Sequence, residues 1–550
     1  MSTKKLFKQK WIWVLLAAVV VSVSCTNLTE KPYSTVTANN FFQTDEQFSS
    51  ALGAAYSQLG AYAGHNGYFS AQENSTDEVV IPQRGTDWYD GGQWIRAQLH
   101  TFDIKDDYIN NTWTFLFGGV NTCNRLIYQF DQLVKDGTVD QAKAASFTAE
   151  LKVLRALYYY WLLDLYGNVP IVTDFANASK APANNANFQQ GRTALYNFVE
   201  KEVKDNMGKL SRANDASTYG RMNVWAAHFI LAKLYLNAKV YTGTAHWQEA
   251  AAECDSIINS GNYSLSTNFF DNFKTQNQNS SETIFAIPYD QTFLTGFNIA
   301  NMTGHYLTQQ TFNLKEQPWN GYASLEDFYN SFQNNDVRKQ GFLEGYQKSA
   351  SGNILIDQSA FPGEPHGDTL FFTPHINQLE PQAWREAGVR FHKFEYASGA
   401  TSNLSNDFPV FRYADVLLMK AEALWRMNNS DAEALRLVNM IRERAGLSDY
   451  SSLDAYKILL ERGHEMYTEA WRRSDLIRFQ GGMHYVYSSD GTRGAQYPSG
   501  QTAFNDAWWP SGENSRSTAD PDQHVNVYPI PFAQLQANTN LNQNPGYPTQ

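Results

Sequence analysis

Residues 151–170 read LKVLRALYYYWLLDLYGNVP, and this stretch predicts how the chain folds. Apolar residues recur there at spacings of three and four, the period of one helix face: Leu151, Leu154, Tyr158, Trp161 and Leu165. Other apolar residues occupy the remaining faces, which indicates a helix buried among other helices. Gly167 and Pro170 then supply a stop signal. We therefore expect a mainly α-helical protein.

The same apolar periodicity predicts two helix–turn–helix pairs. Apolar stripes over 225–236 and 247–257 flank the turn at Thr242-Gly243-Thr244, and stripes over 414–424 and 434–441 flank Asn428-Asn429-Ser430. Their lengths are close to the 34 residues of tetratricopeptide repeats, although the repeat signature is incomplete. We predict a tetratricopeptide-like helical repeat scaffold with long irregular loop insertions and minor β structure.

The middle of the chain differs from the helical parts. Residues 262–410 are rich in Asn, Gln, Ser, Gly and Pro, with scattered aromatic residues and one strand-like run at 281–288. An irregular stretch of this length inside a folded protein is usually functional. No Pro/Ser-rich linker separates it from its flanks, so we expect a single domain over 25–550 that carries this loop-rich insert.

The first 24 residues are typical of a secretory signal peptide. Lys4, Lys5, Lys8 and Lys10 precede an apolar run over 11–21, which is too short for a transmembrane helix. Small residues lead directly to Cys25, the pattern of a bacterial lipoprotein signal, so we expect Cys25 to be acylated and to anchor the protein in a membrane. The alternative is an ordinary signal peptide with a chance cysteine. Removal of 1–24 deletes four lysines and no acid, and changes the formal net charge from −12 to −16.

Composition excludes several classes of protein. Only 18% of residues are charged, and no cluster of Lys and Arg lies in the body of the chain, so a nucleic-acid partner is not expected. Apart from Cys25, only Cys123 and Cys254 are cysteines, and both lie in helical patterns. We expect them to be buried free thiols rather than a disulfide.

Catalytic motifs are absent as well. The sequence has no Gly-rich phosphate loop, no Gly-x-Ser-x-Gly and no complete zinc motif, since Thr468 stands where a second histidine would follow His464-Glu465. We expect no catalytic residues, no metal and no cofactor. Glu461, Glu465 and Glu469 are interpreted as a structural ion-pair face with Arg462, Arg472 and Arg473 at helical spacing.

Carboxylate pairs for glycoside hydrolysis stay open at this point, because two such acids need only be close in space. Asp77-Glu78, Asp87 with Asp90, and Glu326-Asp327 are conceivable pairs. Each is more simply a helix cap or a solvated charge.

Two polar loops carry aromatic residues that no helix face can bury. They are RGTDWYDGGQW at 84–94 and QPWNGY at 317–322. Flat rings beside Asp, Asn, Gln and Arg suit sugars, whose C–H faces pack on aromatic rings while polar groups bind the hydroxyls. The simpler alternative is that the rings fill small cores under the loops. The candidate ligand residues are Trp88, Trp319, Trp94, Asp87, Arg84 and Tyr322.

The ordered series of motifs along the chain resembles the SusD/RagB outer-membrane glycan-binding lipoproteins of Bacteroidetes. The pieces include Cys25 with Leu28-Thr-Glu-Lys-Pro32, Asp87-Trp88-Tyr-Asp-Gly-Gly92, Arg155-Ala-Leu-Tyr158 through Pro170, Asn335-Asp-Val-Arg338, Phe411-Arg-Tyr-Ala-Asp415, Arg473-Ser-Asp-Leu-Ile-Arg478 and Tyr528-Pro-Ile-Pro531. Ala470 departs from the series, because the family usually has Gly before its Trp-Arg pair.

The resemblance implies a non-catalytic protein that captures a polysaccharide or oligosaccharide on the outer membrane. It also implies delivery of the glycan to a SusC-like TonB-dependent transporter. Within the family the glycan site includes aromatic residues of the early loop and the central insert, which correspond to Trp88 and Trp319. Two other functions remain as alternatives, a helical glycoside hydrolase or lyase and a peptide- or protein-binding repeat scaffold.

Overall fold

The computed structural model describes residues 44–480 and 524–549. The signal peptide and Cys25 therefore lie outside the described residues. The chain divides into two units, 1–48 and 49–550, and the account below concerns the second unit.

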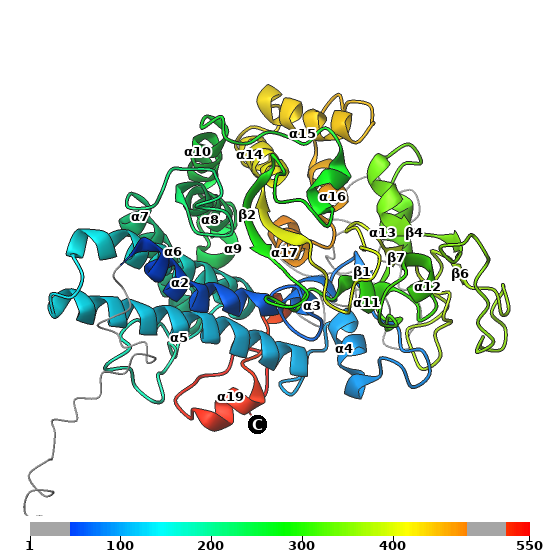
Figure 1. Cartoon of the computed structure of the whole chain (residues 1–550), viewed down its shortest axis with the longest axis horizontal. Coiled ribbons are helices and arrows are strands. Elements are labelled where there is room, and N and C mark those ends of the chain that lie inside the picture. The colour runs from blue at the N-terminus through cyan, green and yellow to red at the C-terminus, as the bar shows by residue number, and fades with distance from the viewer. Residues whose placement is uncertain (1–43, 481–523, 550) are drawn as a thin grey trace, which may run out of the picture. The chain divides into compact units, whose positions relative to one another are not determined.

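Helices are the predominant secondary structure of this unit, with a few short strands (Figure 1). The helices are α2 (Asp45–Tyr56), α3 (Tyr68–Glu73), α4 (Gln93–Leu99), α5 (Asp107–Lys135), α6 (Gln141–Tyr166), α7 (Phe188–Met207), α8 (Val224–Leu236), α9 (Ala238–Thr242), α10 (Trp247–Ile258), α11 (Ile299–Thr303), α12 (Thr308–Phe312), α13 (Glu326–Ser331), α14 (Tyr413–Met427), α15 (Ala432–Arg444), α16 (Ala455–Met466), α17 (Arg472–Gln480) and α19 (Phe532–Ala537). The strands are β1 (Val79–Val80), β2 (Thr283–Pro288), β3 (Ala323–Ser324), β4 (Phe342–Leu343), β5 (Gly345–Tyr346), β6 (Phe371–Phe372), β7 (Arg390–Phe391) and β8 (Asp407–Arg412).

Helix α6 contains the stretch quoted at the outset and is buried on nearly all sides, as predicted. It packs between α5 and α7, and Figure 1 shows α5 and α6 side by side in cyan. Its Tyr158 ring lies directly on Gly119 of α5, where a Cβ would come within 2.2 Å of the ring. The helix ends at Gly167, whose φ of 73° is strained for any residue with a Cβ.

Both predicted helix–turn–helix pairs are confirmed. Helix α8 packs against α10, and α14 packs against both α10 and α15, so the helices form a continuous row. Cys123 and Cys254 are buried and free, as expected. The predicted fold class, a mainly helical scaffold with irregular insertions and little β structure, is confirmed.

Strands β2 and β8 enclose the loop-rich insert. They pair antiparallel from Thr283↔Arg412 to Pro288↔Asp407, so the chain leaves the scaffold and returns to it at one place. A second short pairing, β1 with β3, joins the insert to the segment just before the Trp88 loop. This pairing brings two loops distant in sequence to one side of the fold.

A buried ion network lies between the insert and the helices. Glu465 pairs with Arg412 (2.6 Å), Arg444 and Arg338 (3.2 Å), and these side chains are enclosed or nearly so. Burial alone raises the pKa of Glu465, but the three guanidinium groups outweigh burial and hold that pKa well below its usual range. The remaining members of the network are Glu282, Asp336, Lys393, Arg442, Glu461 and Glu469.

The expected helical-spacing pairs of Glu461, Glu465 and Glu469 are wrong in detail. Helix α16 ends at Met466, so Glu469 is not on that helix face. Arg462 pairs instead with Asp415 and Asp475, and Arg472 pairs with Asp77. The role of these acids is structural, but their partners are distant in sequence, which spacing along a helix cannot reveal.

Gly463, inside α16, and Ala470, just after it, have clear conformational roles. Ala470 has φ of 64°, a left-handed conformation that glycine adopts more easily, which explains why glycine suits this position. Gly463 makes room for Arg472, since a Cβ there would lie 2.7 Å from its guanidinium.

The network predicts a large difference between buried and surface acids. We expect Glu465→Gln to lower the free energy of unfolding by about 3–5 kcal/mol, because it leaves three buried arginines short of one negative charge. The matched control is Glu433→Gln, whose pair with Arg436 lies at the surface and contributes less than about 1 kcal/mol. Urea unfolding followed by circular dichroism measures both. Equal small losses would contradict the assignment.

A buried carboxyl pair predicts the pH dependence of stability. Burial raises the pKa of Glu73 to about 8, and the pKa of its neighbour Glu78 is raised by burial and then by Glu73. An acid with a raised folded-state pKa binds its proton more tightly when folded, so stability is lost as pH rises from about 4.5 to 8. We expect Glu73→Gln, which mimics the protonated acid, to raise the melting temperature at pH 8 and to change it little at pH 4.5. The opposite ordering in a thermal melt series would refute this.

Candidate functional site: a tryptophan pair on two loops

The structure brings Trp88 and Trp319 together, although 231 residues separate them in the chain. The Trp88 Nε1–H donates a hydrogen bond of 2.6 Å to the Trp319 carbonyl oxygen. Both side chains are half-buried, so part of each indole is accessible. The bond locks two rings from different loops into one surface.

The Trp319 turn is held by backbone bonds to α11 and its C-terminal end. The amide of Trp319 donates to the Asn301 carbonyl, the amide of Asn320 donates to that of Gly304, and the amide of Tyr322 donates to that of Met302. Asn320 has φ of 53°, a left-handed conformation that asparagine tolerates. This turn is therefore a fixed platform.

The buried side chain of Arg84 connects the two loops. Its guanidinium donates to the carbonyls of Asn320 (2.8 Å), Gly321 (2.9 Å) and Ala387 (2.9 Å), and it is 3% exposed. Burial lowers the pKa of Arg84 to about 10, so it stays charged at neutral pH. Arg390 acts in the same way on the carbonyls of Arg385 and Ala387. Arg84 therefore positions the platform and has no free face for a ligand.

Trp94 and Tyr322 form the floor of the site. They are only 1% and 2% exposed, and the Trp88 ring packs on them with centroid distances of 6.1 and 5.5 Å. The Trp94 Nε1–H donates to Asp90, and the Tyr322 hydroxyl bonds to Ser70. Their rings support Trp88 and are not accessible to a ligand. The expectation that Trp94 stands in a loop is wrong, because Trp94 lies in the first turn of helix α4, which buries it.

The rim of the site is polar and aromatic. Asp87 is half-buried and accepts a hydrogen bond from the Tyr306 hydroxyl. The His65 ring meets Trp319 edge-on with centroids 4.8 Å apart, and Tyr89 is 54% exposed. Loss of water around the ring lowers the pKa of His65, so it is neutral at pH 7. Sequence reasoning missed His65 and Tyr306, for which there was no local signal, and it passed over Tyr89 inside the quoted loop.

The acids suggested for catalysis have structural partners. Asp77 forms a bidentate ion pair with Arg472, with both hydrogen bonds 2.7 Å long. Asp90 accepts a hydrogen bond from Trp94, and Glu326 pairs with His375. Within residues 44–480 and 524–549, no group of three His, Cys, Asp or Glu side chains is placed to hold a metal ion. The same described residues include no helix with the length and apolarity needed to cross a bilayer. The accessible groups of the site are aromatic ring faces with a few polar groups beside them.

Gly321 allows the close contact between the two loops. A Cβ at this position would lie 2.3 Å from the Trp88 indole. We expect Gly321→Ala to push the Trp88 ring outward and to break its bond to the Trp319 carbonyl, so that tryptophan fluorescence shifts to longer wavelength. The control is Gly53→Ala in α2, where a Cβ meets nothing within 4 Å and the spectrum should not change. An unchanged spectrum in Gly321→Ala would contradict the packing described.

The fold and site together define a helical-repeat scaffold that carries an aromatic surface on inserted loops. Comparison with known families agrees with this class. Residues 229–547 match the model described as "SusD family", and residues 27–236 match one described as "Starch-binding associating with outer membrane". The chain belongs to the SusD family.

Individual relatives are distant but cover most of the chain. The starch-binding protein SusD of Bacteroides thetaiotaomicron is 25% identical over 76% of each chain, and a SusD-like protein of Bacteroides ovatus is 22% identical over 86% of this chain and 83% of the relative. Among solved structures, a SusD superfamily protein of Parabacteroides distasonis has a TM-score of 0.68 at 19% identity, covering 93% of this chain and 100% of the other. Surface glycan-binding protein A of Bacteroides thetaiotaomicron in complex with laminarihexaose has a TM-score of 0.66 at 21% identity, with 91% and 99% coverage. These structural likenesses show the shared fold.

Proposed function

We propose that this protein binds a polysaccharide or oligosaccharide at the surface formed by Trp88 and Trp319. The observation that carries the proposal is the Trp88–Trp319 hydrogen bond, which holds two partly accessible indoles in a fixed arrangement. Rings that are ordered before binding lose little conformational entropy when a sugar stacks on them. Aromatic faces suit the C–H faces of pyranose rings.

The rest of the site agrees with a neutral ligand. Tyr89 extends the exposed aromatic surface, and Asp87 and the neutral His65 supply hydrogen-bonding groups beside it. Trp94, Tyr322 and Arg84 act as supports in this proposal, so the ligand contacts are Trp88, Trp319 and Asp87 with Tyr89 and His65 added. One relative of this chain is named a starch-binding protein, and one neighbouring structure contains laminarihexaose.

Binding without catalysis is part of the proposal. Glycoside hydrolysis needs two carboxyl groups free to act on one bond. Asp87 and Asp90 each already accept a hydrogen bond, from Tyr306 and Trp94 respectively, and Asp77 is paired with Arg472. Because these carboxylates are already engaged in hydrogen bonds or an ion pair, the arrangement favours a binding protein over a hydrolase or lyase.

The cellular role we propose is capture at the outer membrane and delivery to a SusC-like TonB-dependent transporter. Family membership supports this role, since the description of one matching model includes association with the outer membrane. Cys25, after its lysine-rich and apolar leader, would carry the lipid anchor on the cell surface.

The glycan proposal predicts the behaviour of paired tryptophan variants. In affinity gels that contain laminarin or soluble starch, the wild-type chain should be retarded by at least one of these glycans. Trp88→Ala and Trp319→Ala should each weaken retention at least tenfold in Kd, because a central aromatic contact contributes about 2 kcal/mol or more. The double variant should migrate as in a gel without glycan.

Phe293→Ala is the control, since that ring is 91% exposed outside the site and its loss should leave retention unchanged. Retention of the double variant at the wild-type level would reject the site. Release of reducing ends during incubation would favour an enzyme, and co-purification with a transporter without glycan binding would favour a protein-binding scaffold.

A further inference from the structure

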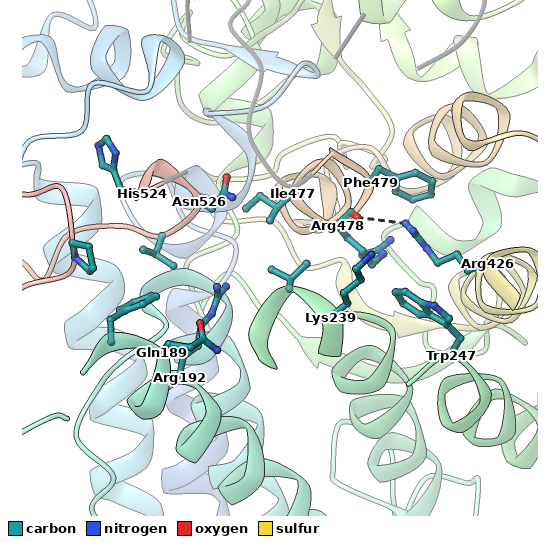
Figure 2. Close-up of a pocket in the computed structure, with 14 residues that line it drawn as sticks. Gln189, Arg192, Lys239, Trp247, Arg426, Ile477, Arg478, Phe479, His524 and Asn526 are labelled. Carbon is teal, nitrogen blue, oxygen red and sulfur yellow. Dashed lines mark hydrogen bonds between the residues drawn. The ribbon is translucent and has the colours of Figure 1, made fainter. Parts of the chain in front are cut away.

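A separate cavity of about 690 Å³ lies between the helical scaffold and the C-terminal segment. Its walls come from α7, α9, α10, α14, α17 and residues 524–545, and it shares no lining residue with the tryptophan site. Figure 2 shows Gln189 and Arg192 on one side, Lys239, Trp247 and Arg426 on another, and Ile477 and His524 across from them. A volume of this size accommodates a small ligand.

All Lys, Arg, Asp and Glu side chains that line the cavity are basic. Arg192, Lys239, Arg426 and Arg478 all face the cavity, and no Asp or Glu is among its lining residues. This is unusual for a chain of formal net charge −12. The local excess of positive charge therefore needs an explanation.

The acids behind the wall neutralise only part of this positive charge. Glu422 and Asp475 bind Arg478, and Glu422 also binds Arg426. The same acids, with Asp415, also serve the buried cations Arg462 and Lys233. Four cations thus share three carboxylates in this cluster, and none of those carboxylates is left for Arg192 or Lys239.

Arg192 is the clearest sign of a missing partner. It is only 7% exposed, its Nε has no hydrogen-bond partner, and in the part of the chain that the structure describes it forms neither a hydrogen bond nor an ion pair. The guanidinium lies over the rings of Phe188 and Tyr241, at 5.9 and 5.2 Å. A buried, unpaired guanidinium is costly unless an acceptor completes it.

Nearby groups do not supply that acceptor. The Asp164 carboxylate attracts Arg192 electrostatically, but its oxygens are occupied by Tyr241 (2.6 Å), Gln72 and Ser474. Arg473 is fully buried, its Nε and Nη1 have no hydrogen-bond partner among the described residues, and it adds to the positive potential at Arg192. Lys239 is exposed at the cavity and has no acidic partner among the described residues.

We propose that this cavity is a binding site for an oxyanion, a carboxylate, sulfate or phosphate group, with Arg192 and Lys239 as its principal ligands. The planar guanidinium of Arg192 presents paired N–H groups that match two oxygens of such an anion, and the exposed Lys239 adds a second positive charge to the lining. The side chains of Phe188, Ile477 and Val527 form apolar walls. The anionic group can therefore belong to a small organic molecule such as a sugar acid or a sulfated sugar. This site does not depend on the glycan site proposed above.

The test uses the full chain and three probes: inorganic sulfate, inorganic phosphate and glucuronate, with glucose and sodium chloride as matched controls. We expect at least one anion to raise the melting temperature saturably and to give a binding isotherm by calorimetry, at constant ionic strength. Glucose and chloride should do neither. Tighter binding of glucuronate than of sulfate or phosphate would identify a sugar-borne anion, and the reverse order would identify a free inorganic anion.

Three variants assign the binding to this cavity. Arg192→Gln and Lys239→Ala should each weaken anion binding at least tenfold, whereas Lys201→Ala, an exposed lysine of α7 paired with Asp205, should not. Without anion, Arg192→Gln should melt at or above the wild-type temperature, because it removes an uncompensated buried charge. Lys239 is exposed, so its variant keeps the test valid if Arg192→Gln folds poorly.

Absence of binding by all three anions, or equal binding by wild type and Lys239→Ala, would overturn the proposal. The Trp88→Ala, Trp319→Ala double variant should still bind the anion. Failure of the glycan site and failure of the anion site are therefore distinguishable.

Discussion

The charge network around Glu465 is the constraint on which the rest of the structure depends. Glu282 precedes β2 and Arg412 ends β8, and both belong to the network, so the point where the insert leaves and rejoins the scaffold is tied to α15 and α16. Arg338 and Lys393, from within the insert, pair with Glu461 and Glu469. Buried charges tolerate little displacement, because each depends on its partners for the interactions that water would otherwise provide. The network thus fixes how the insert lies on the helices.

The tryptophan site depends on that placement. With the insert fixed, β3 pairs with β1, and the Trp88 loop meets the Trp319 turn. Arg84 and Arg390 then bind backbone carbonyls rather than carboxylates, which joins loops that have few other reasons to stay together. A rigid aromatic surface built on irregular loops is therefore a consequence of charges buried elsewhere in the fold.

Charge is also distributed unevenly between the two proposed sites. The glycan surface has neutral or hydrogen-bonded groups at its rim, which suits an uncharged polymer. The cavity beside α7 concentrates cations in an acidic chain, and its Arg192 has no hydrogen-bond or ion-pair partner among the described residues. Two ligands of different chemistry could then bind without competing, since no residue lines both sites.

The sequence by itself determined the helices and their pairing, and it indicated the two loops that we propose carry the glycan site. Apolar periodicity predicted α6, α8, α10, α14 and α15, because the burial of one helix face follows a local repeat. The occurrence of tryptophans in polar loops singled out Trp88 and Trp319. The family series showed that Ala470 stands where glycine is usual, and its left-handed backbone explains why glycine suits that position. Only the tertiary structure decided that Trp94, Tyr322 and Arg84 support the site, that His65 and Tyr306 join its rim, and which arginines neutralise Glu465. Those facts rest on contacts between residues far apart in the chain, and no local pattern encodes which distant side chains meet.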